Sequence, residues 1–303
     1  NKEMKNGMPL VSVINPCYNS VELYRTLESV CKQSYTCWEV ICVDDGSDID
    51  LSPVICSLDE PRIFYYRLSE HINANVARNY GILHSHGAYI AMLDSDDEWL
   101  ETHLEDSLRL LEEGQADCVY GSLILRGETD TVFTTRLLNE GETMIDFLLS
   151  TGYGAQTSTL VLTVSSAKDI LWDETLRRHQ DYNFMVRYSR KYRLVPLLTP
   201  TVVYHCSNAV RAIDFDSCIR FICSVEDEIT DRIYMNYHKH MLRLAVVHNA
   251  GEEVVSYYRK AVTHYEYLLS LYDYLQILRP QGKFQAWVLK MKYIWGMLRV
   301  RIG

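Results

Sequence analysis

The sequence of 303 residues lacks several patterns that mark common classes of protein. Its nine cysteines include no Cys-x-x-Cys pair and its histidines are not clustered, so a structural zinc site is not expected. The odd number of cysteines, several of them within apolar runs, favours reduced thiols in a cytoplasmic chain. A net charge of −10 provides no basic face for a phosphate backbone, so nucleic acid is not expected as a partner.

Long apolar segments are also lacking. Residues 1–7 contain no apolar stretch of the kind found in a secretory signal, which predicts a chain that is not exported. No window reaches the roughly 18 to 20 uninterrupted apolar residues that a membrane-spanning helix needs. Neither Gly-x-Gly-x-x-Gly nor a P-loop sequence follows an expected strand, so dinucleotide-binding and P-loop classes lose their main support.

Residues 10–124 alternate short apolar runs with amphipathic segments, a pattern typical of βα units on a mostly parallel sheet. Two of the intervening segments, Val21–Lys32 and Val76–His84, have apolar residues at helical spacing. The predicted fold class is therefore α/β, with helices flanking the central sheet. The expected strands are Leu10–Ile14, Trp38–Val43, Ile63–Leu68, Tyr89–Leu93 and Cys118–Ile124, followed by a mixed region with strands at Thr159–Thr163, Leu194–Leu198 and Val202–Tyr204 and a helix at Tyr182–Tyr192.

Polar clusters follow three of the expected strands. They lie at Asn15–Asn19, Asp44–Ser47 and Asp94–Asp97. Because ligands bind beyond the carboxyl ends of strands in such sheets, we expect one pocket to contain all three clusters.

The segment Asp94-Ser95-Asp96-Asp97 carries three carboxylates directly after a buried strand pattern. Carboxylates this close repel one another, and a bound divalent cation that also carries a phosphate would relieve the repulsion. The alternative is a solvated acidic loop that caps the following helix, His103–Leu111. Taken alone, this segment supports both interpretations equally.

Four motifs in register resemble the nucleotide-binding half of family 2 glycosyltransferases with the GT-A fold. The resemblance continues more weakly through Trp172-Asp173-Glu174 and Gln180-Asp181, and covers about two thirds of the chain. The motifs are Val11-Ser-Val-Ile-Asn-Pro-Cys-Tyr-Asn19, Val43-Asp-Asp-Gly-Ser47, Ala77-Arg-Asn-Tyr-Gly-Ile82 and Leu93-Asp-Ser-Asp-Asp97.

The resemblance implies a nucleotide site. An aromatic face would stack on the nucleobase, and a carboxylate accepting from a ring N–H would discriminate between bases. Without the resemblance, Tyr18 would be read as a sheet-edge aromatic, and Asp44 and Asp45 as turn or cap residues. The implied set places Pro16 and Tyr18 at the base, Asp44 or Asp45 as its acceptor, Arg78 and Asn79 at the far side, and Asn19, Asp94 and Ser95 around the nucleotide.

The resemblance also implies a metal site for Mn²⁺ or Mg²⁺. Asp96 would be the direct ligand, Asp94 would lie near the ribose and the metal, and Asp97 would support them. His205 ends the last expected strand and could reach the metal, although a single histidine in such a place is more often structural.

Transfer requires a base for the acceptor hydroxyl, and by resemblance this is Asp181. Without the resemblance, an aspartate at a helix start is more often an N-cap. Gln180 departs from the family pattern, which usually has an acidic residue there, and this weakens the assignment of the base. Trp172, Asp173 and Gln180 would lie near the acceptor.

We expect a catalytic domain at residues 1–206 and a helical region at residues 207–303. Residues 1–125 would bind the nucleotide sugar, and residues 126–206 the acceptor and base. The last segment, 283–303, has five basic residues and no acidic one, so the net charge of −10 combines +5 here with −15 elsewhere. Its apolar residues recur at helical spacing, which is typical of an interfacial helix on an anionic membrane. The alternatives are packing on the catalytic domain or against a second subunit in a homodimer.

Together with this resemblance, the sequence predicts a cytoplasmic, inverting, metal-dependent glycosyltransferase, which the membrane interpretation of residues 283–303 would place at the inner face of the cell membrane. It would move a sugar from a nucleoside diphosphate, UDP by family habit, to a hydroxyl of a saccharide or lipid-linked saccharide in bacterial surface-polysaccharide synthesis. A sugar nucleotidyltransferase is disfavoured, since Asn15–Asn19 is not a basic glycine-rich loop. A non-catalytic binding module is disfavoured by the presence of Asp94, Asp96 and Asp181.

Overall fold

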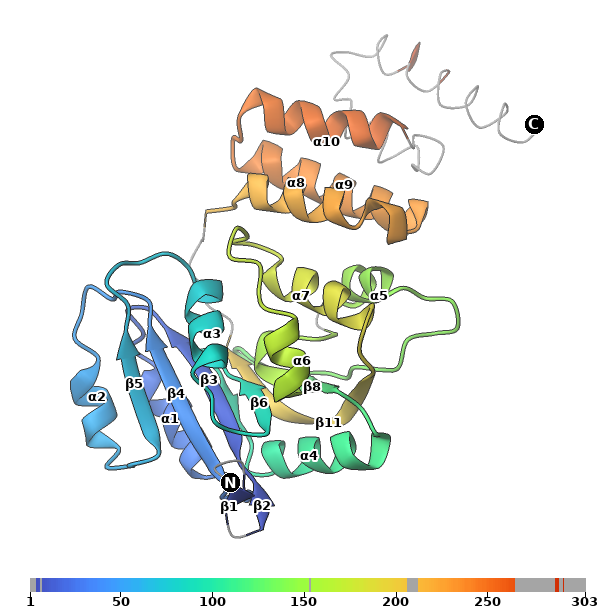
Figure 1. Cartoon of the computed structure of the whole chain (residues 1–303). Coiled ribbons are helices and arrows are strands. Elements are labelled where there is room, and N and C mark those ends of the chain that lie inside the picture. Colours follow the sequence, from blue (N-terminus) through green and yellow to red (C-terminus); the bar gives the residue numbers. More distant parts are fainter. Residues whose placement is uncertain are drawn as a thin grey trace. The chain divides into compact units, whose positions relative to one another are not determined.

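A computed structural model describes residues 4–5, 7–152, 154–205 and 212–264, together with residues 287, 288 and 291 (Figure 1). The chain divides into two compact units, residues 1–224 and residues 225–303. This division comes after helix α8 (Phe215–Ser224), whereas the boundary expected from the sequence, at residue 206, comes before it.

The first unit is built on a sheet of nine strands in the order β5-β4-β3-β6-β10-β8-β11-β7, with β9 paired to β8. Neighbours among β5, β4, β3 and β6 run parallel, as do β8 and β11, whereas β10 runs antiparallel to β6 and β8. The strands are β3 (Val11–Cys17), β4 (Trp38–Asp44), β5 (Ile63–Arg67), β6 (Tyr89–Met92), β7 (Glu98–Trp99), β8 (Cys118–Arg126), β9 (Thr131–Phe133), β10 (Val161–Thr163) and β11 (Leu194–His205), and a separate hairpin joins β1 (Met4–Lys5) to β2 (Met8–Pro9).

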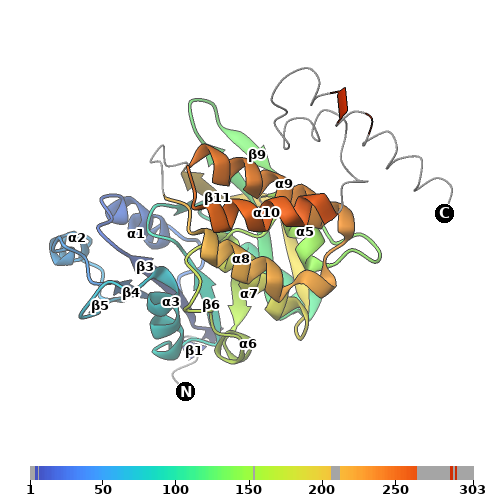
Figure 2. The same cartoon turned by 90° about the horizontal axis from the view of Figure 1, so that it is seen from above.

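Helices cover both faces of this sheet, and α1 (Leu23–Cys31) and α3 (Ala74–Leu83) lie on opposite sides of it (Figures 1 and 2). All seven residues of β3 and all seven of β4 are buried, as expected for parallel strands covered on both faces. The other helices are α2 (Ser52–Ser57), α4 (His103–Gly114), α5 (Met144–Thr151), α6 (Val164–Asp169) and α7 (Gln180–Ser189), with a 3₁₀ turn η1 at Thr157–Thr159.

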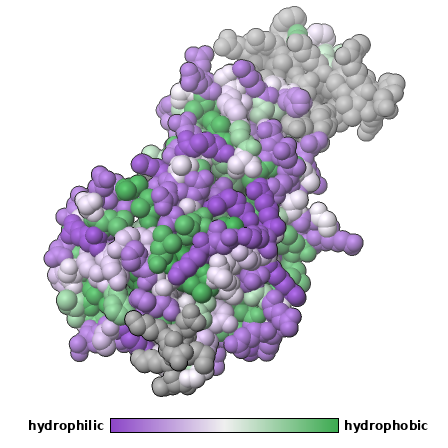
Figure 3. Space-filling model, viewed as in Figure 1, coloured by the Kyte–Doolittle hydropathy of each residue, from purple (hydrophilic) through white to green (hydrophobic). Residues whose placement is uncertain are grey.

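The apolar residues that recur at helical spacing in the sequence are the ones buried in the core. In α1, Leu23, Leu27 and Val30 are fully buried in one cluster with residues of β3 and β4. Helix α3 begins at an Asn73 cap, whose side chain accepts hydrogen bonds from the N–H groups of Asn75 and Val76. On the face seen in Figure 3, hydrophilic residues cover much of the described surface and apolar residues reach it in smaller groups.

The predicted α/β class with a mostly parallel sheet is confirmed, and each strand expected in residues 10–124 is present. The last two expected strands are one strand, β11, whose register against β8 shifts between Leu197 and Val202. The strand expected to start at Thr159 starts instead at Val161, because Thr157–Thr159 forms the turn η1.

The described part of the second unit is helical, as expected for this region. It contains a short turn η2 (Glu226–Glu228) and two helices, α9 (Asp231–Val247) and α10 (Glu252–His264), which pack against each other. Within the described residues, no helix is long and apolar enough to span a membrane. The amphipathic helix expected at residues 283–303 lies outside the described residues, apart from positions 287, 288 and 291.

Candidate active site

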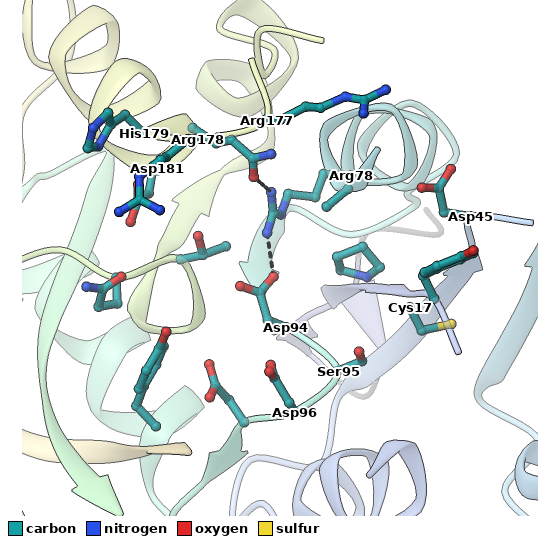
Figure 4. A pocket seen from close by; sticks show the side chains of 18 of the residues that line it. Cys17, Asp45, Arg78, Asp94, Ser95, Asp96, Arg177, Arg178, His179 and Asp181 are labelled. Atoms are coloured by element: carbon teal, nitrogen blue, oxygen red, sulfur yellow. Dashed lines mark hydrogen bonds and ion pairs between the residues drawn. The ribbon is translucent and has the colours of Figure 1, made fainter. Parts of the chain in front are cut away.

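The carboxyl ends of β3, β4 and β6 meet at one edge of the sheet, as predicted, and a cavity of about 550 Å³ opens there (Figure 4). Ten of the residues predicted from the sequence line this cavity: Pro16, Tyr18, Asp45, Arg78, Asp94, Ser95, Asp96, Asp97, Gln180 and Asp181. The other six do not line it: Asn19, Asp44, Asn79, Trp172, Asp173 and His205.

The acidic loop 94–97 is fixed by its backbone. The carbonyl oxygen of Ser95 accepts hydrogen bonds from the hydroxyls of Ser20 and Thr26, each at 2.9 Å. The carbonyl oxygen of Asp96 accepts one from Nη2 of Arg25 at 2.8 Å. The start of α1 therefore holds this loop at the edge of the sheet, with its carboxylates on the cavity.

Asp97 is the buried member of the cluster. Its Oδ2 accepts a hydrogen bond from Oγ of Ser158 at 2.5 Å, and its Oδ1 accepts one from the backbone N–H of His205 at 3.3 Å. Burial, and then repulsion from Asp94 and Asp96, raises the pKa of the Asp97 carboxyl well above its ordinary value. The cluster thus concentrates negative charge that a cation would relieve.

The lining as a whole has more acid than base, with five carboxylates against three guanidinium groups. In the part of the chain that the structure describes, no three His, Cys, Asp or Glu side chains are grouped so as to hold a metal ion. His205, the third predicted ligand, has its Nε2 2.6 Å from Oε1 of Glu98. The acids at the cavity could therefore supply one or two ligands to a metal.

Arg78 connects the acidic loop to the helix that carries the predicted base (Figure 4). Its Nη2 donates to Oδ1 of Asp94 at 2.6 Å, and its Nη1 donates to Oε1 of Gln180 at 2.9 Å. Its guanidinium carbon also lies 4.6 Å from the centre of the Trp172 ring. Gln180, the position that departs from the family pattern, is thus used to hold Arg78.

Asp181 lies in the first turn of α7, on the opposite side of the cavity from Asp96 (Figure 4). Burial raises the pKa of its carboxyl to about 6, against the lowering effects of the Tyr182 N–H and the charge of Arg78. The N–H of Tyr182 donates to Oδ1 at 2.9 Å. A carboxyl with this pKa is ionised near neutrality and is a stronger base than an exposed aspartate.

A third group of residues, Tyr18, Asp45 and His71, forms the end of the cavity beside β4. The rings of Tyr18 and His71 are stacked with centroids 3.8 Å apart, and Nδ1 of His71 lies 2.8 Å from Oδ2 of Asp45. Gly46 allows this arrangement, because its φ is +68° and a Cβ there would lie 2.5 Å from the backbone carbon of Glu70. An aromatic face and a buried carboxylate therefore stand together, as a nucleobase site requires.

Asn19 and Asp44 do not line this end of the cavity but form hydrogen bonds next to it. Oδ1 of Asn19 accepts a hydrogen bond from the N–H of Asp48 at 2.8 Å. Asp44 is fully buried and accepts hydrogen bonds from the N–H of Ser47 at 2.8 Å and the hydroxyl of Tyr65 at 2.5 Å. Of the two aspartates considered as base acceptors, it is Asp45 that reaches the cavity.

The segment next to Arg78 is held in place by contacts of Asn79, Trp172 and Asp173. Asn79 exchanges two hydrogen bonds with the backbone of Trp172, at 2.8 and 2.9 Å. The Trp172 ring is buried and stacks on Phe184 at 4.4 Å. Asp173 accepts a hydrogen bond from the N–H of Thr175. These three residues position the segment that leads into α7.

Several lining residues were not predicted from the sequence. His71 could have been found only from its contact with Tyr18, because no motif contains it. Arg177, Arg178 and His179 form a basic run that ends two residues before the predicted base, in an acidic chain, and this signal was available. The remaining ones are Cys17, Ala74, Gln156, Thr157 and Tyr204.

Comparisons with known proteins show which family the chain resembles. The model of the family described as "Glycosyl transferase family 2" matches residues 12–214. The amylovoran biosynthesis glycosyltransferase AmsB of Erwinia amylovora is 34% identical over 207 residues, covering 64% of this chain and 69% of AmsB. The UDP-Glc:α-D-GlcNAc-diphosphoundecaprenol β-1,3-glucosyltransferase WfaP of Escherichia coli is 34% identical over 128 residues, covering 42% of this chain and half (50%) of WfaP.

The fold is also found in solved structures. The structure of Staphylococcus aureus TarS in complex with UDP has a TM-score of 0.65 and 17% identity, covering 95% of this chain and 92% of that one. The TarS complex with UDP-GlcNAc has a TM-score of 0.68 and 16% identity, covering 94% and 92%. The family model spans well over half of the chain, and the chain therefore belongs to glycosyl transferase family 2.

Proposed function

We propose that this family 2 glycosyltransferase moves a sugar, with inversion, from a UDP-sugar to a hydroxyl of a saccharide acceptor in bacterial surface-polysaccharide synthesis. The observation that carries the proposal is one cavity with the acids of loop 94–97 on one side and the carboxyl of Asp181 on the other. UDP as the nucleotide is supported by the complexes of TarS and by the donor in the name of WfaP. The polysaccharide role is supported by the name of AmsB.

The nucleotide would bind at the β4 end of the cavity. Tyr18 is 40% exposed, so its ring has surface left for stacking on a base, and Asp45 provides a buried acceptor for a ring N–H. Arg78 fixes Asp94, which would lie by the ribose. The sugar would then point towards α7.

A divalent cation fits the acidic loop. Mg²⁺ and Mn²⁺ prefer carboxylate oxygens, and an ion shared with a diphosphate needs only one or two of them. Asp96 and Asp94 would hold it, while His205 could join only by leaving Glu98. When bound, the ion neutralises charge that develops on the departing diphosphate.

Asp181 would act as the base. Its carboxylate takes the proton of the acceptor hydroxyl as that oxygen bonds to the anomeric carbon, and the bond from this carbon to UDP breaks. Attack from the face opposite the leaving group inverts the configuration, and no covalent enzyme intermediate is needed.

The proposal is tested by incubating the protein with UDP-, GDP- and dTDP-sugars and Mn²⁺, and measuring release of nucleoside diphosphate without acceptor. We expect slow release from a UDP-sugar, and none would be seen from a pure binding module.

In Asp96→Ala the affinity for UDP should no longer depend on Mn²⁺. Asp130→Ala, which changes an exposed acid away from the cavity, is the matched control. An unchanged Mn²⁺ dependence in Asp96→Ala would refute the metal assignment.

A further inference from the structure

The carboxylate of Asp45, the proposed acceptor for a nucleobase N–H, has one oxygen without a hydrogen bond. Asp45 is 2% exposed and lies at the end of the cavity away from Asp181 (Figure 4). Its Oδ1 accepts a hydrogen bond from the N–H of Ile72 at 3.0 Å, whereas its Oδ2 is buried with no hydrogen-bond partner among the described residues. Leaving a buried carboxylate oxygen in this state is costly, so a ligand that donates an N–H to it would bind favourably.

The imidazole of His71 lies against this oxygen. Its Nδ1 is 2.8 Å from Oδ2 of Asp45, but it donates its hydrogen bond to the backbone carbonyl oxygen of Asp45, at 3.3 Å. The same ring is stacked on Tyr18, with the centroids 3.8 Å apart and the planes 20° apart. Whichever face of the Tyr18 ring a nucleobase uses, it can therefore reach Oδ2 only after the imidazole has moved.

The backbone that carries this imidazole is fixed, whereas its side chain is partly open to solvent. The N–H of Ile72 ties the segment to Asp45, and Gly46 is so close that a Cβ there would lie 2.6 Å from the backbone nitrogen of His71. The side chain of His71 is nevertheless 46% exposed. A change of side-chain rotamer, which is fast for exposed residues, can thus uncover Oδ2 without movement of the backbone.

We propose that His71 is a gate on the nucleobase site. In the nucleotide-free protein its imidazole covers Oδ2 of Asp45, and it moves away when a base binds. This inference rests on the proposed function, because it takes Asp45 as the acceptor for the base. Opening the gate breaks the stack on Tyr18 and the contact with Asp45, so the apparent affinity for the nucleotide is lower than that of the open site.

Calorimetry of UDP binding in the presence of Mn²⁺ tests the gate in the full chain. His71→Ala removes the imidazole and should lower the Kd for UDP by about three- to tenfold, because the base no longer displaces a stacked ring. His84→Ala is the matched control and should leave this Kd unchanged. His84 is stacked on Tyr80 with the centroids 3.9 Å apart, and neither residue lines the cavity.

A crystal structure of the wild-type protein with UDP gives an independent readout. It should show a ring N–H of uracil donating to Oδ2 of Asp45, and the imidazole of His71 moved away from that oxygen.

Two results would overturn the inference. One is an imidazole that still covers Oδ2 in the UDP complex. The other is a His71→Ala variant, with unchanged melting temperature, that binds UDP no more tightly than the wild-type protein, since the imidazole would then be neutral or part of the base site. Failure of the wild-type protein to bind UDP would instead contradict the proposed function, and is measured separately.

Discussion

Asp181 and Asp97 are both carboxyl groups whose pKa is raised chiefly by burial, yet they stand in different surroundings. Asp97 is held by Ser158 and by the backbone of His205, beneath the acidic loop. Asp181 faces the cavity from α7 and has Arg78 as its nearest stabilising charge. These surroundings favour the supporting role proposed for Asp97 and the proton-accepting role proposed for Asp181.

A pH dependence follows from Asp181. Its pKa is raised to about 6, so the carboxylate form that can accept a proton is lost as the pH falls through that value. We predict that kcat/KM has an acidic limb with a midpoint near pH 6, and that activity rises with pH through it. Measuring the Kd for UDP and Mn²⁺ over the same range separates the base from the metal-binding carboxylates. A midpoint near 4, the range of an exposed aspartate, would contradict the assignment.

Among individual residues, the sequence identified the acidic side chains of the cavity better than the basic ones. Asp94, Asp96 and Asp45 were found because they follow apolar strands, and strand ends meet at one edge. His71, Arg177 and Arg178 reach the same cavity from loops that precede helices, where polar residues are ordinary. Their positions depend on tertiary contacts such as the Tyr18 stack, which no local pattern encodes.

Helix α3 is the element that joins the two halves of the site. Asn75 and Asn79 face the segment after α6, and Nδ2 of Asn75 donates to the carbonyl of Asp173 at 2.6 Å. Arg78, on the same helix, reaches Asp94 and Gln180. Three side chains of one helix thus set the distance between the acidic loop and α7.

Removing the side-chain amide of Asn79 should destabilise the segment before α7. Asn79→Ala deletes hydrogen bonds to both backbone groups of Trp172 and one to Glu174, and we predict a loss of about 2–3 kcal/mol in the free energy of unfolding. Urea unfolding measures it, with Asn139→Ala on an exposed loop as the control. UDP affinity should change little, because Asn79 does not line the cavity. A loss below about 0.5 kcal/mol would show that the hydrogen bonds of Asn79 contribute little to the stability of the fold.

Long, strongly patterned elements were predictable, whereas of two short strands the sequence indicated β10 and not β7. β3 and β4 are continuous apolar runs with both faces covered, so their pattern alone identifies them. β7 has two residues and β10 three, and each exists because it pairs with a strand distant in sequence. The antiparallel insertion of β10 between β6 and β8 is set by such pairing and could not be read from periodicity.

The cavity and the basic segment belong to different units of the chain. Every residue that lines the cavity belongs to the first unit. The positive charge of residues 283–303 follows at the other end of the sequence, in a segment that remains a prediction because most of it lies outside the described residues. We propose that this segment attaches the enzyme to an anionic membrane surface, near a lipid-linked acceptor.

A truncation tests this proposal. A chain that ends at Gly282 loses five basic residues and the apolar stripe, so we predict that it no longer co-sediments with anionic vesicles. The full chain should co-sediment with anionic vesicles more strongly than with zwitterionic ones. Equal sedimentation of the two chains on anionic vesicles would remove the membrane role and leave packing of this segment on the protein as the alternative.

The role of Asp181 as the base is the central claim, and one variant addresses it directly. Asp181→Asn keeps the shape of the side chain but cannot accept the proton, so kcat for transfer should fall by about 10²–10⁴-fold while the Kd for UDP with Mn²⁺ stays within about threefold. Asp169→Asn, an acid on α6 that pairs with Lys191, should behave as wild type. Turnover of Asp181→Asn close to the wild-type rate would contradict the account and move the base elsewhere in the cavity.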